Sequence, residues 1–125
     1  MSGLYLTTLL VADYDEAKTW FVDRLGFRVK EDSDRGAGKR WIVLATGGAD
    51  LLLAKANSEE QRGHIGKQAG GRVAFFLETD DFDRDLRRMS DAGVRFLEAP
   101  RNEDYGKVAQ FADLYGNKWD LIERA

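Results

Sequence analysis

The chain has 125 residues, of which 43% are hydrophobic and 33% charged, and its formal net charge is −3 at pH 7. These values are typical of one soluble globular domain, and an acidic chain without a basic patch predicts no nucleic-acid partner. The lack of cysteine excludes disulfides, thiolate catalysis and cysteine-ligated metals. No apolar run is long enough to span a membrane and no signal-peptide pattern precedes Leu4, so a cytoplasmic location is expected.

The first half of the chain predicts the element order β-α-β-β-β. Leu4 to Val11 form an apolar run of good strand formers, which indicates a buried strand. Asp13 is a typical N-cap for a helix over residues 14–25, and Gly26 is a typical stop signal. Three further strands are expected after this helix, at residues 27–31, 41–45 and 51–56.

The second half predicts the same order after a polar segment, 57–71, whose four glycines indicate a mobile connector. Asp81 is expected to cap a second helix over residues 82–92, which Gly93 ends. A loop over 99–106 holds the only proline. The strands of this half are expected at residues 72–78, 94–97, 108–112 and 118–123.

Equivalent signals of the two halves lie 68 residues apart. Asp13-Tyr14-Asp15 opens the first predicted helix and Asp81-Phe82-Asp83 opens the second. A repeat of this length indicates two copies of one supersecondary unit, with the functional site where the copies face each other. The sequence therefore predicts one α+β domain over residues 1–125, with module 1 at 1–56, the connector at 57–71 and module 2 at 72–125.

The last two predicted strands flank Asp113-Leu114-Tyr115-Gly116-Asn117, which Lys118-Trp119-Asp120-Leu121 follows. The two predicted helices close at Leu25-Gly26-Phe27 and Ala92-Gly93-Val94. In order and spacing these segments resemble the vicinal oxygen chelate superfamily of glyoxalases, bleomycin-resistance proteins and extradiol dioxygenases. The resemblance implies two βαβββ modules whose mixed sheets form an open cup around a small-molecule ligand, and it implies a homodimer.

The resemblance also implies four positions at which superfamily members with metal-dependent chemistry hold their metal. Counted from the helix-opening aspartates and the turn glycines, these positions are Leu6, Leu52, Ala74 and Asp120. A divalent cation needs several oxygen or imidazole donors, and one carboxylate does not replace its hydration shell. A shift of one residue does not restore the site. We therefore expect no metal and no other cofactor, and no metal-dependent glyoxalase or dioxygenase activity.

Asp120 is the leading candidate for a ligand-binding residue, because alternation places it on the cup-facing side of the last strand. Its carboxylate could bind a cationic ligand group or act as a general base, and the alternative is a structural pairing with a nearby arginine or lysine. Arg72 could bind a ligand carboxylate or phosphate, and is otherwise a solvated residue at a strand end. His64, the only histidine, lies in the connector, and its role stays open.

Aromatic and apolar residues complete the predicted ligand-binding set. Trp41 and Phe76 could stack on a planar ligand, and Tyr105 could close over it from the loop. The apolar wall of the cup is expected to include Leu6, Leu52 and Ala74.

Two functions remain open from these residues. The first is a metal-free protein of the bleomycin-resistance type that binds a small molecule in the sheet cup. The second is an enzyme of the superfamily, a lyase, isomerase or dioxygenase-like protein, that uses Asp120 with or without a metal.

Overall fold

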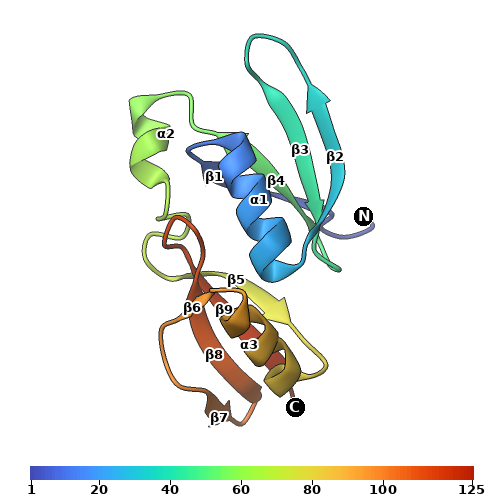
Figure 1. The fold of residues 1–125 in the computed structure, drawn as a ribbon, viewed down its shortest axis with the longest axis vertical. Helices are drawn as coiled ribbons and strands as arrows, with labels where there is room; N and C mark the ends of the chain where they lie inside the picture. Colours follow the sequence, from blue (N-terminus) through green and yellow to red (C-terminus); the bar gives the residue numbers. More distant parts are fainter. The chain divides into compact units, whose positions relative to one another are not determined.

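Each half of the chain builds a mixed β-sheet with a helix against it in the computed structural model, which describes residues 1–125 (Figure 1). The two halves form separate units, Met1–Ile65 and Gly66–Ala125. No helix of either unit is long and apolar enough to cross a bilayer.

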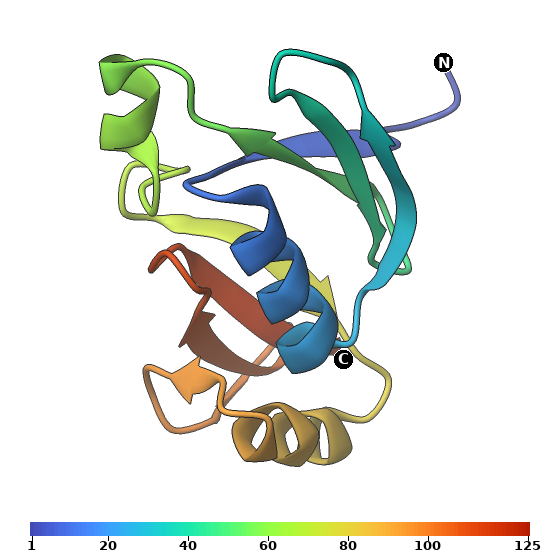
Figure 2. The same cartoon turned by 45° about the horizontal axis from the view of Figure 1, so that its top comes forward.

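The first unit consists of four strands and two helices. They are β1 (Leu6–Val11), α1 (Tyr14–Leu25), β2 (Arg28–Asp34), β3 (Arg40–Ala45), β4 (Asp50–Lys55) and α2 (Glu59–His64). The sheet has the order β1-β4-β3-β2, in which β1 runs parallel to β4 and the other pairs are antiparallel. Helix α1 packs against β2, β3 and β4, and α2 follows the end of β4 (Figure 2).

The second unit repeats this topology with one extra strand. Its elements are β5 (Val73–Glu78), α3 (Phe82–Asp91), β6 (Arg95–Phe96), β7 (Arg101–Glu103), β8 (Gly106–Ala112) and β9 (Lys118–Arg124). The sheet has the order β5-β9-β8-β6, with β5 parallel to β9, and β7 pairs with β8. The predicted α+β class and the two βαβββ modules are therefore confirmed.

Both long helices begin at the predicted caps. The side chain of Asp13 accepts a hydrogen bond from the backbone N–H of Glu16 at 2.8 Å, and Asp81 accepts one from Arg84 at 3.1 Å. Gly26 ends α1 with a φ of 75°, a left-handed conformation that glycine adopts without steric cost. The helix over residues 14–25 is confirmed at both ends, and the second helix ends one residue before its predicted limit.

The hydrophobic core of each unit lies between its sheet and its long helix. Side chains alternate along a strand, so every second residue faces the helix. In the first unit the buried strand residues include Leu9, Val11, Ile42, Leu44, Leu51 and Leu53, and the buried residues of α1 include Ala17, Phe21 and Leu25. In the second unit the buried residues include Phe111, Trp119 and Leu121 from the sheet and Phe82 and Met89 from α3.

The prediction of a mobile connector over residues 57–71 missed the helix α2. The side chain of Ser58 caps this helix by accepting a hydrogen bond from the backbone N–H of Gln61 at 3.1 Å. Ser58 and Gln61 have the spacing of a capping box, which is a sequence signal for the start of a helix. The four glycines of the segment favoured the prediction of a connector instead. The strand β7, within the predicted loop 99–106, was also missed because it is polar and its pairing with β8 is a tertiary contact.

Candidate functional site

The strands β3 and β4 separate at one end of the first sheet. Their paired register covers three residue pairs, from Ile42 with Leu53 to Leu44 with Leu51. Beyond Ile42 and Leu53 the strands run apart, β3 toward the β2–β3 turn and β4 toward α2, as both ribbon views show (Figures 1 and 2). Side chains from the separated ends therefore enclose a space that a fully paired sheet would close.

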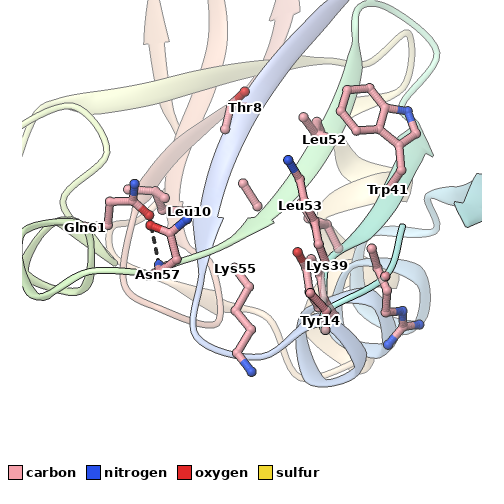
Figure 3. A pocket seen from close by; sticks show the side chains of 16 residues that line it. Thr8, Leu10, Tyr14, Lys39, Trp41, Leu52, Leu53, Lys55, Asn57 and Gln61 are labelled. Carbon is pink, nitrogen blue, oxygen red and sulfur yellow. Dashed lines mark hydrogen bonds between the residues drawn. The ribbon is translucent and has the colours of Figure 1, made fainter. Parts of the chain in front are cut away.

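A pocket of about 750 Å³ lies at this opening (Figure 3). Its volume falls in the range of small-molecule sites, about 300–1,000 Å³. The lining comes from β1, the start of α1, the β2–β3 turn, β3, β4 and the segment that enters α2. The lining residues are Thr8, Leu10, Tyr14, Gly36, Ala37, Gly38, Lys39, Arg40, Trp41, Leu52, Leu53, Ala54, Lys55, Ala56, Asn57 and Gln61.

Apolar side chains and one large aromatic ring form much of the lining of this pocket. Leu10 and Leu52 line it from the two parallel strands, and Trp41 lines it from β3 (Figure 3). The guanidinium carbon of Arg35 lies 5.7 Å from the centroid of the Trp41 ring, a cation–π contact that helps to hold the indole in place. The pocket can therefore receive a planar apolar molecule against Trp41.

Arg40, one of the cations in the pocket lining, is neutralised by acids of its own unit. Its guanidinium lies 2.9 Å from a carboxylate oxygen of Asp15 and 2.8 Å from one of Asp32. Hydrogen bonds from Arg40 and Lys18 hold the pKa of Asp32 at about 2. The guanidinium carbon also lies 5.5 Å from the ring centroid of Tyr14. Arg40 is thus held as part of the pocket wall.

The second unit holds a buried carboxylate, Asp120, on β9. The residue is 6% exposed, and its Oδ1 atom has no hydrogen-bond partner. Burial raises the pKa of this carboxyl group, the charge of Arg101 partly offsets the effect, and the charge of Glu98 adds to it. A carboxyl group in this environment could accept a proton or bind a hydrogen-bond donor.

Asp120 lies in a row of side chains that crosses the second sheet. Its strand partners are Phe76 on β5 and Gln110 on β8, and the carbonyl of Gln110 accepts a hydrogen bond from the backbone N–H of Leu97 at 2.8 Å. Phe76 is 68% exposed and Leu97 is also exposed. The buried carboxylate therefore lies between Phe76 and Gln110 in the row, and Leu97 follows beyond Gln110.

Arg101, the cation that acts on Asp120, is bound to other acids. Its Nε donates to Glu98 at 2.9 Å, and one terminal nitrogen lies 2.8 Å from a carboxylate oxygen of Glu103 and 3.5 Å from the Tyr105 hydroxyl. These hydrogen bonds raise the pKa of Arg101. No ion pair joins Asp120 to an arginine or lysine, so the structural pairing that was open from the sequence is not present.

The turn between β8 and β9 is built on a second buried carboxylate, Asp113. It accepts hydrogen bonds from the backbone N–H groups of Tyr115 and Asn117, both at 3.0 Å. It also accepts from the side-chain amide of Asn117 at 3.0 Å and from the Trp119 indole at 3.1 Å. The segment from Asp113 to Asn117 therefore has a structural role and fixes the start of β9, two residues before Asp120.

Some of the ligand-binding residues predicted in the first half line the pocket, and others lie outside it. Trp41 and Leu52 line it, whereas Leu6 lies on β1 outside the lining. His64 is exposed at the end of α2. The sequence analysis missed Tyr14 and Lys39 as lining residues, because a helix-start residue and a turn residue meet the sheet only in the folded chain.

The predicted residues of the second half lie in the second unit. Arg72 is exposed immediately before β5, and Tyr105 is exposed between β7 and β8. The pairing of β5 with β9 is irregular between Val73 and Phe75, which places Ala74 at a bulge. Their roles as ligand-binding residues remain predictions.

The residues at the four superfamily metal positions do not fit a metal ion. Leu6, Leu52 and Ala74 carry no donor atom, and the bulge in β5 offers only Val73 and Phe75 as replacements. No group of three or more histidine, aspartate or glutamate side chains comes together in the structure. Asp120 is the only one of the four with an oxygen donor, and one carboxylate is too few for a divalent cation.

Relatives and solved structures resemble the chain over nearly its whole length. An uncharacterised protein of Shewanella frigidimarina (strain NCIMB 400) is 50% identical over 119 residues, which cover 92% of this chain and 88% of that protein. The crystal structure of UcmS2 has a TM-score of 0.84 and 27% identity, with 98% of each chain covered. TnmS3, an antibiotic binding protein from Streptomyces sp. CB03234, has a TM-score of 0.79 and 28% identity, with 100% of this chain and 98% of that chain covered.

A family model adds the decisive comparison. It describes the Glyoxalase/Bleomycin resistance protein/Dioxygenase superfamily and matches residues 3–121. The modules, the terminal turn and this match agree, and the chain belongs to the glyoxalase/bleomycin resistance protein/dioxygenase superfamily.

Proposed function

We propose that this protein binds a small organic molecule with a planar apolar body in the pocket of the first unit, without a metal of the superfamily type. The pocket itself carries the proposal, because its volume of about 750 Å³ suits a small molecule and its lining combines Trp41 with leucine and alanine side chains. The similarity to TnmS3, an antibiotic binding protein, supports it. A cytoplasmic location is part of the same proposal.

The Trp41→Ala variant tests this function. Removal of the indole is expected to weaken binding at least tenfold, because stacking on a large aromatic ring contributes about 1 kcal/mol beyond the apolar area that it buries. Isothermal titration of the full chain with 2-naphthoate, 2-naphthalenemethanol and 2-naphthylmethylamine measures the effect. Tyr5→Ala is the matched control, since Tyr5 is an exposed aromatic residue outside the pocket. If no probe binds, or if Trp41→Ala leaves every affinity unchanged, the function is refuted.

A second candidate function is proton transfer by Asp120. The buried position, the unpartnered Oδ1 atom and the raised pKa are properties of a general acid or base. No hydrogen bond or ion pair joins Asp120 to a nucleophile or a second acid–base group, which leaves binding as the better supported function. An Asp120→Asn variant separates the two, because it keeps the side-chain shape and removes the proton acceptor.

We further propose that residues 1–125 act as one domain of two modules and that two chains form a homodimer. The strands β1 and β5 each lie at the edge of their own sheet, and exposed apolar residues lie on or just before them, including Leu4, Tyr5 and Phe76. Open apolar edges favour association, and two-fold pairing is the commonest oligomeric state. Light scattering is expected to give twice the chain mass of 14.1 kDa. A mass of one chain at micromolar concentration would contradict the dimer.

A further inference from the structure

We propose that the pocket of the first unit selects ligands whose planar body carries an anionic group, and that Lys39 and Tyr14 bind this group. The inference rests on the proposed function, since it names the class of molecule that the same pocket would take. It is carried by the charges and hydrogen-bond donors of the lining.

The lining of the pocket contains cations and no acid. Among its sixteen residues are Lys39, Arg40 and Lys55, and none is aspartate or glutamate. This is unusual for a chain whose 22 acidic residues exceed its 19 lysines and arginines. The local charge of the pocket is therefore opposite in sign to the net charge of the protein.

Lys39 is the cation of this set that is both unpaired and directed over the pocket. Arg40 is neutralised by Asp15 and Asp32, whereas Lys39 makes no ion pair. The Lys39 side chain extends over the pocket between β4 and Trp41, while Lys55 points away from it (Figure 3). A ligand anion would give the Lys39 ammonium group the partner that the protein does not supply.

Backbone hydrogen bonds hold Lys39 in the turn immediately before β3. Its N–H donates to the carbonyl of Gly36 at 3.0 Å, and its carbonyl accepts from the N–H of Arg35 at 2.8 Å. The turn is closed further by the carboxylate of Asp34, which accepts from the N–H of Gly36 at 2.8 Å. The base of the Lys39 side chain is thus fixed, and only its methylene chain must be ordered when a ligand binds.

Tyr14 supplies a second donor from the start of α1. The residue is 9% exposed, and its hydroxyl has no hydrogen-bond partner in the protein although it lies among the lining residues (Figure 3). The hydroxyl is open to the pocket rather than buried in the core, and an acceptor of the bound ligand would give it the hydrogen-bond partner that a phenol beside an apolar surface normally has. Gln61 adds further hydrogen-bond donors to the lining. Its Oε1 already accepts from the backbone N–H of Asn57 at 2.9 Å, so its amide N–H groups are left to donate to a ligand.

Titration calorimetry with three probes of equal shape and different charge tests the inference. At pH 7.5 and low salt we expect 2-naphthoate to bind the full chain at least tenfold more tightly than 2-naphthalenemethanol, and 2-naphthylmethylamine, which is protonated, to bind most weakly. Lys39→Gln is expected to lower the affinity for 2-naphthoate about tenfold and to leave that for the alcohol unchanged. Tyr14→Phe should lower the naphthoate affinity several-fold.

Lys30→Gln is the control for a general loss of positive charge. Lys30 is exposed on β2, outside the pocket, and pairs with Asp50, so this change should leave the naphthoate affinity within twofold. Equal binding of the acid and the alcohol, or an unchanged naphthoate affinity in Lys39→Gln, overturns the anion selectivity and leaves the proposed function standing. Failure of all three probes to bind overturns both.

Discussion

Replacement of Asp113 by alanine is expected to lower the free energy of unfolding by about 3 kcal/mol or more. The Asp113 side chain is buried and accepts hydrogen bonds from two backbone N–H groups, the Asn117 amide and the Trp119 indole. Alanine would remove the acceptor of all four hydrogen bonds, three of which are buried. Urea unfolding followed by circular dichroism measures the loss.

Two variants calibrate this result. Asp113→Asn keeps one acceptor oxygen and should cost less than the alanine variant. Asp34→Ala removes an exposed carboxylate that accepts a single hydrogen bond, from the N–H of Gly36 at 2.8 Å, and should cost less than about 1 kcal/mol. If Asp113→Ala costs no more than Asp34→Ala, the Asp113 network does not hold the turn.

Replacement of Asp120 by leucine is expected to raise the free energy of unfolding at pH 7.5 by about 1–2 kcal/mol, because it removes a buried carboxylate that no cation pairs. The fold itself shows that leucine suits this position. Leu52 is the counterpart of Asp120 in the first unit, since Leu52 pairs with Thr8 on the parallel strand just as Asp120 pairs with Phe76. A stabilising substitution would indicate that Asp120 is kept for function at the expense of stability.

The gain in the free energy of unfolding from Asp120→Leu should increase as the pH rises. Burial raises the pKa of Asp120 in the folded state above its ordinary value of 3.8. The wild-type protein therefore loses stability as the pH rises through the folded-state pKa, and the leucine variant does not. The advantage of the variant should be largest above that pKa and smallest below 3.8. A loss of stability at pH 7.5 would contradict the prediction.

Asp120→Asn and added zinc complete this experiment. The asparagine variant removes the charge but keeps a buried polar group, so it should gain less stability than the leucine variant. Excess Zn²⁺ should leave the Tm of the wild-type protein unchanged, because Leu6, Leu52 and Ala74 provide no donor atoms. A Tm that rises with Zn²⁺ in the wild type but not in Asp120→Leu would identify a metal site and refute the proposed metal-free function.

The sequence by itself determined the features that depend on neighbouring residues or on the repeat of the two halves. Asp13 and Gly26 set the ends of α1, and Asp81 sets the start of α3, because caps act on backbone groups within one turn of the helix. The 68-residue repeat predicted two modules of equal topology, and both sheets have it. Alternation placed Trp119 and Leu121 on one face of β9 and the ligand-binding candidate Asp120 on the other.

Only the tertiary structure decided which residues share a site. The pocket exists because β3 and β4 separate after three residue pairs, and strand pairing is a long-range interaction that no local pattern encodes. Lys39 and Tyr14 join Trp41 there from a turn and a helix start. The isolation of Asp120 likewise depends on Arg101 being held by Glu98 and Glu103. Hydrogen bonds and ion pairs act over a few ångströms, so partner choice follows from the arrangement of distant segments, whereas caps and alternation are already present along the chain.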